Sequence, residues 1–115
     1  MEEFGVSKKI LEKYNVRKEG EKYFLPNKDL DWNDTAEFIY HPNNKPKWIM
    51  NGKGKTTGDL YGGYIFDESN EYIVILEGQK DMLIWNSNIK ENAIAITGGA
   101  NRKPLDKYID FFENK

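Results

Sequence analysis

The feature that most constrains this chain is a pair of continuous apolar runs in its second half. Residues 72–76 read Tyr-Ile-Val-Ile-Leu, and residues 93–97 read Ala-Ile-Ala-Ile-Thr. Neither run alternates apolar with polar residues, so each predicts a strand covered on both faces, as in a parallel sheet. Residues 79–85 between them can form a short helix, and the order strand–helix–strand predicts a right-handed βαβ unit.

A second helix is expected after the second strand. Pro104 suits a first helical position, and an amphipathic pattern with i, i+3, i+4, i+7 spacing follows it at Leu105, Tyr108, Ile109 and Phe112. Two parallel strands alone make a poor sheet, because sheets usually hold ~4–6 strands. Either the first half supplies further strands, or the chain is cut from a longer one; we favour the second explanation.

The first half predicts one helix and a small antiparallel-rich sheet. Ser7 is a candidate N-cap for a helix that ends at Asn15, and the charged residues 17–21 predict a turn. A strand over 22–26 should end at its proline, and residues 27–34 should be a loop. Strands over 36–40 and 47–50 follow, joined by a proline-rich turn. The expected fold class is therefore α+β, with one subdomain over 1–66 and the start of an α/β unit over 67–115.

Composition excludes several classes of site. The chain has 115 residues, no cysteine and one histidine, so disulfides, thiolate zinc sites, cysteine nucleophiles and multi-histidine metal sites are all excluded within it. No stretch approaches the run of roughly 18 apolar residues that crosses a bilayer. The start of the chain also lacks a signal-peptide pattern. We expect a cytoplasmic globular domain with no membrane partner.

A basic stretch occupies residues 41–58, which contain four lysines and no acidic residue. Clustered lysines can attract a polyanion, or they can simply keep an exposed hairpin solvated. Trp48 lies between Lys47 and Asn51, where an aromatic ring could stack on a base. The alternative for Trp48 is inward packing on a strand.

Two carboxylates follow the first apolar run. Glu77 lies where the strand opens into a loop, and Asp81 follows four residues later, so both could face one crevice at the carboxyl end of the sheet. Paired carboxylates suit Mg²⁺, which takes oxygen ligands and keeps several waters. The alternative is that Glu77 caps the following helix.

A glycine pair follows the second apolar run. The backbone N–H groups of Gly98 and Gly99 could cradle a phosphate, although a tight strand-to-helix turn explains the pair equally well. His41 has no second histidine and no suitably spaced serine, so we interpret it as a structural or polar groove residue.

These residues resemble a known family. Residues 74–83 resemble the first motif of the TOPRIM domain, which is a strand, then Glu-Gly-x-x-Asp, then a helix, and residues 93–100 are similar to its second strand and glycine loop. Upstream pieces run in the order seen before TOPRIM in DnaG-type bacterial primases, with a shortened version in phage primase-helicases. Those pieces are residues 11–16, 22–26, 47–51 and 60–62.

The resemblance implies template-directed synthesis of RNA primers from NTPs on single-stranded DNA, with a helicase domain or subunit as a possible partner. It implies that Glu77 is the metal-linked or general acid–base carboxylate and Asp81 its partner, with Mg²⁺ or Mn²⁺ as the cofactor. It also assigns template or nucleotide binding to a set of basic-ridge and loop residues. That set is Lys22, Lys45, Lys47, Trp48, Asn51, Gly98 and Gly99.

Three departures from the family pattern are visible. The second acidic motif, Asp-x-Asp, should follow a third strand, and the chain ends before it, so we expect this fragment alone to hold metal weakly and to be inactive. The zinc-binding domain of primases is absent, as the missing cysteines require. Where primases usually have an arginine before the lysine ridge, this chain offers His41.

Three other interpretations stay open. Another TOPRIM enzyme, nuclease or topoisomerase-like, would share Glu77 and Asp81 but not the lysine ridge. A non-catalytic module that binds single strands would bind nucleic acid equally well with or without Mg²⁺. A plain globular domain would carry the Glu-Gly turn by coincidence.

Overall fold

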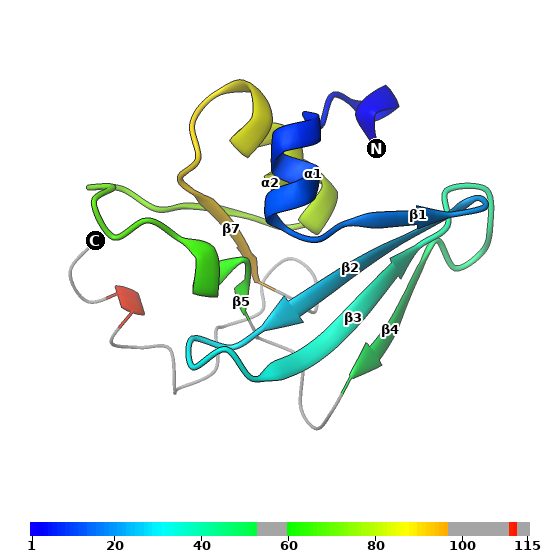
Figure 1. Cartoon of the computed structure of the whole chain (residues 1–115), viewed down its shortest axis with the longest axis horizontal. Helices are drawn as coiled ribbons and strands as arrows, with labels where there is room; N and C mark the ends of the chain where they lie inside the picture. Colours follow the sequence, from blue (N-terminus) through cyan, green and yellow to red (C-terminus); the bar gives the residue numbers. More distant parts are fainter. Residues whose placement is uncertain (53–59, 97–110, 113–115) are drawn as a thin grey trace.

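The described part of the chain folds into two sheets and two α-helices. The computed structural model describes residues 1–52, 60–96 and 111–112. The first sheet is antiparallel, with the order β1-β2-β3-β4 (Figure 1). Its strands are β1 (Arg17–Glu19), β2 (Lys22–Lys28), β3 (Asp34–Tyr40) and β4 (Trp48–Gly52).

The second sheet is smaller and mixed, with the order β5-β7-β6. Its strands are β5 (Leu60–Tyr61), β6 (Val74–Leu76) and β7 (Ala93–Ile96). β6 and β7 are parallel and are joined through a helix, whereas β5 runs antiparallel to β7. An antiparallel sheet followed by a smaller α/β unit confirms the α+β class and the predicted strand–helix–strand order.

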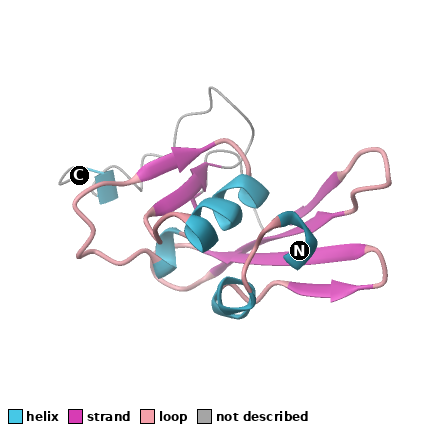
Figure 2. Cartoon of the chain, turned by 90° about the horizontal axis from the view of Figure 1, so that it is seen from above, coloured by secondary structure: helices cyan, strands magenta, loops and turns pink. Residues whose placement is uncertain are grey.

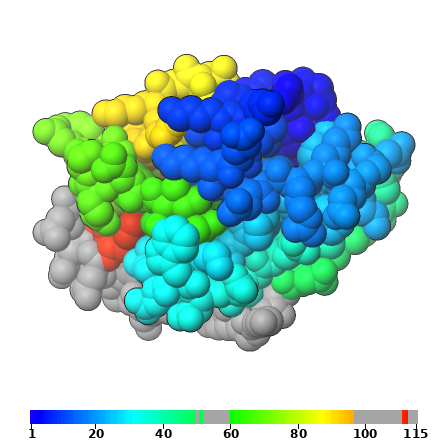
Figure 3. Space-filling model, viewed as in Figure 1, coloured from blue at the N-terminus to red at the C-terminus, as the bar shows by residue number. Residues whose placement is uncertain are grey.

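α2 (Gln79–Asn88) packs on β6, β7 and α1 (Lys8–Lys13), and buried side chains of both helices join the core on one face of the first sheet (Figure 2). α1 begins after Ser7, whose Oγ accepts the N–H of Ile10 at 3.3 Å, so the predicted N-cap is confirmed. α2 lies against α1 and between β6 and β7 in sequence, and the two helices are in contact although far apart along the chain (Figure 3). Two short 3-10 turns, η1 (Glu2–Phe4) and η2 (Gly63–Ile65), complete the described elements.

The main core lies between the first sheet and the helices. Strands β2 and β3 alternate buried and partly exposed residues, because successive side chains point to opposite faces of a sheet. The buried side chains of these strands meet those of both helices and of β7 in a single cluster. Its largest members are Ile10, Tyr14, Tyr23, Leu25, Phe38, Tyr40, Tyr61, Met82 and Leu83.

The prediction that both apolar strands are covered on both faces is right for β7 and wrong for β6. All four residues of β7 are buried. β6 is the last strand in its sheet among the described residues, and Ile75 is 50% exposed. The strand is also shorter than predicted. It begins at Val74 rather than at Tyr72, and the Tyr72 side chain projects into solvent.

Two details of the first half also differ from the prediction. The charged residues 17–21 are not merely a turn, because β1 pairs with β2 around Gly20, whose φ is +63°. β2 continues past Pro26 to Lys28. Its pairing with β1 ends at Phe24, so no β1 residue lies opposite Pro26 to need its missing N–H.

The predicted C-terminal helix lies mostly outside the residues that the structure describes. Of the helix predicted over 104–112, only residues 111–112 are described, and they are helical; the rest lies outside the described part of the chain. The predicted boundary between a first subdomain over residues 1–66 and an α/β unit over residues 67–115 stays a prediction. Neither α-helix in the described ranges has the length and apolar composition that a bilayer-spanning segment needs.

Candidate functional site

The two predicted acidic residues lie at the start of α2. Glu77 directly follows β6, and Asp81 is in the first turn of the helix. Both side chains are exposed. A β-carbon placed on Gly78 would lie 3.8 Å from Asp81 Oδ2, so the Asp81 carboxylate is directed back toward the loop that carries Glu77. The structure therefore brings both residues to the carboxyl end of β6, where ligands bind in open α/β sheets.

Neither carboxylate is engaged by a neighbour within the described ranges, where no hydrogen bond or ion pair involves it. The N-cap of α2 is Gly78, so the alternative role of Glu77 as the helix cap is not observed. Asp81 does carry a negative charge in the first turn, where it interacts favourably with the helix dipole.

The pair fits part of a magnesium coordination shell. Carboxylate oxygens are the ligands that Mg²⁺ prefers, and the ion commonly keeps several waters beside one or two carboxylates. Over residues 1–52, 60–96 and 111–112, no group of three or more acidic, histidine or cysteine side chains is placed to hold a metal. Within the described residues, water or phosphate oxygens would have to complete the coordination of an ion held by Glu77 and Asp81.

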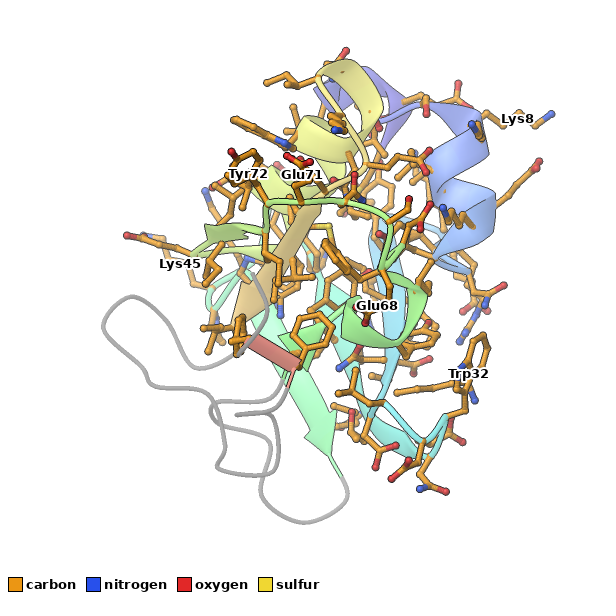
Figure 4. All side chains as sticks on the ribbon, turned by 90° about the vertical axis from the view of Figure 1, so that its left-hand side faces the viewer. Lys8, Trp32, Lys45, Glu68, Glu71 and Tyr72 are labelled. Atoms are coloured by element: carbon orange, nitrogen blue, oxygen red, sulfur yellow. The ribbon has the colours of Figure 1, made fainter. Side chains whose placement is uncertain are left out.

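Lys45 and Lys47 lie in the connection between β3 and β4, and both side chains are exposed. Figure 4 shows Lys45 at the surface of the molecule. The connection is tied at its base, because the His41 N–H donates to the Lys47 carbonyl at 2.7 Å. The His41 ring lies 3.3 Å from a carboxylate oxygen of Glu21. His41 is thus a polar structural residue of this turn, and the two lysines are presented to solvent.

Trp48 takes the inward-packing alternative. It is the first residue of β4, directly opposite Tyr40 of β3, and the two ring centroids are 4.6 Å apart. The indole is half-buried and packs against the main core. The ring therefore retains an accessible part beside the exposed Lys47.

Lys22 and Asn51 lie on the other face of the first sheet. Lys22 precedes the buried Tyr23 on β2, and Asn51 pairs with Glu37, which faces away from the core. The predicted ridge residues are consequently divided between two faces, with Trp48 inside and these two outside. Gly98 and Gly99 lie outside the described residues.

The structure adds one residue that sequence reasoning missed. Lys80, in the first turn of α2, crosses to the first sheet, where its Nζ lies 3.4 Å from the Tyr40 hydroxyl. Tyr40 in turn packs on Trp48, so Lys80 joins the acidic motif to the lysine-bearing end of the sheet. The available signal was a cation in the first turn of a helix, where the dipole disfavours positive charge.

Searches of known proteins found likeness in structure rather than in sequence. No family model matches the chain, and no curated protein matches it. Solved structures do match. The Aquifex aeolicus primase, with its zinc-binding and RNA polymerase domains, superposes with a TM-score of 0.72 at 17% identity, covering 86% of this chain and 36% of that one.

Two further matches are of the same kind. The primase fragment of the bacteriophage T7 primase-helicase gives a TM-score of 0.69 at 19% identity, covering 86% of this chain and 42% of that one. The Escherichia coli primase catalytic core gives 0.70 at 14% identity, covering 84% and 46%.

The chain therefore has the fold of part of a primase catalytic core. It spans less than half the length of each of these structures. The resemblance to DnaG-type and phage primases is confirmed at the level of fold, because the structural neighbours are the proteins that the motifs indicated.

Proposed function

We propose that this chain is part of a DNA primase that synthesises RNA primers on single-stranded DNA by metal-dependent nucleotidyl transfer. One observation carries the proposal: the fold matches primase cores over 84–86% of the chain's length. The motif Glu-Gly-x-x-Asp, at the junction of β6 and α2, supports it. Residues 67–115 would then be the first part of a TOPRIM domain.

In this proposal the carboxylates of Glu77 and Asp81 would hold Mg²⁺ or Mn²⁺ at the carboxyl end of β6. When bound, the ion would neutralise charge on the phosphates during transfer. Phosphoryl transfer needs mainly positioning and charge neutralisation from the protein. Exposed carboxylates at a strand end, and exposed lysines in the connection that leads to Trp48, are suited to those two tasks.

The proposed partners are a single-stranded DNA template and NTPs, with a helicase domain or subunit in a phage-type or mobile-element protein of the cytoplasm. One similar structure is a DnaG catalytic domain bound to single-stranded DNA. Another contains T7 primase domains bound to an RNA/DNA hybrid beside a DNA polymerase. Lys45, Lys47 and Trp48 would contact the strand, and Lys22, Asn51 and Gly98–Gly99 are proposed to contact template or nucleotide elsewhere.

The test is Glu77→Gln in the complete protein that contains this chain. Primer synthesis should fall by at least about a hundredfold, because a neutral amide cannot replace the charge of a metal-linked carboxylate. The matched control is Glu71→Gln, another exposed carboxylate near β6, which should keep wild-type yield (Figure 4). Circular dichroism should show both variants folded. Wild-type primer yield from Glu77→Gln would overturn the assignment.

The same assays separate the other interpretations. A TOPRIM nuclease would lose Mg²⁺-dependent cleavage in Glu77→Gln and would never make primers. A non-catalytic module would bind single-stranded DNA equally well with and without Mg²⁺, and Glu77→Gln would change nothing.

A further inference from the structure

The Lys80 ammonium is held among aromatic rings. Its Nζ lies 4.8 Å from the centre of the Phe4 ring and 5.2 Å from that of the Tyr40 ring. The Tyr40 hydroxyl is 3.4 Å away. Ring faces attract a cation through their quadrupole, so these contacts fix the position of the ammonium without neutralising its charge.

No carboxylate in the described part of the chain forms an ion pair with Lys80. Other cations do pair: Lys13 binds Glu91 at 2.8 Å, and Lys28 binds Asp34 at 2.9 Å. Among the described residues Lys80 has no ion-pair partner, although its side chain is half-buried and Asp81 lies in the same turn of α2. An ammonium has three donors, and only the Tyr40 hydroxyl is within reach of one of them among these residues.

We propose that Lys80 is a phosphate-binding residue, an inference that rests on the proposed function and extends it. A partly desolvated, pre-positioned ammonium with unused donors is suited to an anion, and lysine recognises phosphate as a point charge. The phosphate belongs either to the backbone of the bound single strand or to the incoming nucleotide.

The surroundings of Lys80 suit a nucleic-acid ligand. Tyr40, which holds the ammonium, packs on Trp48 at 4.6 Å between ring centroids. Proteins that bind single strands combine cations that follow the backbone with aromatic rings on which bases stack. Lys80 also lies in the same first turn of α2 as Asp81, so it belongs to the helix end that carries the carboxylates proposed to hold the metal.

The experiment compares Lys80→Met and Lys80→Arg with wild type in the 115-residue chain. Lys8→Met is the matched control, because Lys8 is an exposed lysine of α1 on the side of the molecule opposite Lys45 (Figure 4). One arm measures the affinity for a labelled oligothymidylate by fluorescence anisotropy over a series of salt concentrations. The second arm measures ATP binding by NMR, following the Trp48 indole N–H. Thermal melts by circular dichroism establish that each variant is folded.

Loss of one phosphate contact has a quantitative signature. Lys80→Met should weaken oligothymidylate binding about fivefold at about 0.1 M salt and reduce the slope of log K against log salt by about 0.7, the value for one single-strand phosphate. Lys80→Arg should restore the slope, and Lys8→Met should match wild type. A merely structural role of Lys80 would lower stability and leave the slope unchanged.

The outcomes distinguish the two phosphate sources. Weakened oligothymidylate binding with unchanged ATP binding assigns the template strand, and the reverse assigns the nucleotide. If Lys80→Met equals Lys8→Met in both arms, the inference is overturned while the proposed function stands. If the wild-type chain binds neither probe, the inference is overturned, and the proposed function is decided separately by primer synthesis in the complete protein.

Discussion

Two buried asparagines tie the separate parts of the structure together. The Asn27 side chain donates to the Leu60 carbonyl at 2.9 Å and accepts the Gly62 N–H at 3.1 Å, which joins the first sheet to β5. Asn86 of α2 accepts the Ala93 N–H at 2.9 Å and donates to the Ala93 carbonyl at 3.1 Å, which joins α2 to β7. Both amides are nearly inaccessible to solvent, so water cannot replace them as hydrogen-bond partners of these backbone groups.

Asn86→Ala should therefore lower the free energy of unfolding by about 2 kcal/mol or more, because it leaves both backbone groups of Ala93 buried without a partner. Urea denaturation measures the loss. The control is Asn43→Ala in the exposed turn before β4, which should cost less than about 0.5 kcal/mol. Equal losses in the two variants would show that the Asn86 amide is not a structural tie.

The Tyr61 hydroxyl, unlike the two asparagine amides, is a buried polar group without a described hydrogen-bond partner. Its side chain is fully buried, and the hydroxyl has no hydrogen-bond partner in the parts of the chain that the structure describes. A buried hydroxyl without a partner costs stability. Tyr61→Phe keeps the edge-on packing against Phe38 and removes that cost, so we expect a gain of about 1 kcal/mol in calorimetry. A loss of stability would mean that the hydroxyl has a partner in the folded protein.

At the scale of elements, Gly62 controls how β5 passes into η2. Its φ is +82°, and a β-carbon there would lie 2.8 Å from both Met82 Cε and Tyr14 Cε1. Gly62→Ala should cost about 2–4 kcal/mol, because left-handed backbone disfavours a side chain and overpacking adds to that cost.

A substitution at Gly20 separates the cost of the left-handed backbone from the cost of overpacking. Its φ is +63°, but nothing lies within 4 Å of a β-carbon placed there. Gly20→Ala should therefore cost only about 1–2 kcal/mol, the backbone part alone. Urea midpoints of the two variants give the steric part by difference. Equal midpoints would show that Met82 and Tyr14 move aside freely.

The elements predicted correctly are those specified by local patterns. The continuous apolar run of β7 and the helical segment before it indicate a βαβ unit whatever surrounds them. β1 could not be predicted, because its short charged sequence is extended only by pairing with β2, where Arg17 lies over the Phe24 ring at 4.7 Å. The exposure of β6 depends on its place in the sheet order, which periodicity does not encode.

The same distinction applies to the candidate site. Glu77 and Asp81 are four residues apart at a strand-to-helix junction, so the sequence predicted their shared location. Lys80 was missed because its ring contacts, Phe4 and Tyr40, come from segments distant in sequence. The division of Trp48 and Asn51 between two faces follows from the register of β3 with β4, which the sequence does not state.

At the scale of the whole molecule, both sheets share one core, and the pKa values of three tyrosines within or beside it are raised. Burial raises the pKa of Tyr14 to about 12, even though a hydrogen bond from Asn86 lowers it. Burial also raises the pKa of Tyr61 well above its ordinary value and, to a smaller degree, that of Tyr64. Tyr14 and Tyr61 stack on each other, with ring centroids 6.1 Å apart.

These raised pKa values predict that stability falls at alkaline pH. Between about pH 10 and about pH 12 the unfolded chain loses phenol protons that the folded chain keeps, so the free energy of unfolding decreases as pH rises. Below about pH 10 both states keep those protons and the full stability is present. Tyr14 alone accounts for about 3 kcal/mol at the upper end of the window, since one pKa unit is about 1.4 kcal/mol.

Urea midpoints measured at about pH 9 and about pH 11 test the effect, with phenolate absorbance as an independent record of ionisation. Tyr61→Phe removes one buried phenol and should flatten the decline. Tyr72→Phe makes the same chemical change on a ring that is 72% exposed and sets the baseline for comparison. If Tyr61→Phe and Tyr72→Phe decline equally, the Tyr61 phenol ionises without unfolding, and the core around it admits water and charge. If only Tyr61→Phe resists alkali, the shared core is a single cooperative unit that must open before its tyrosines ionise.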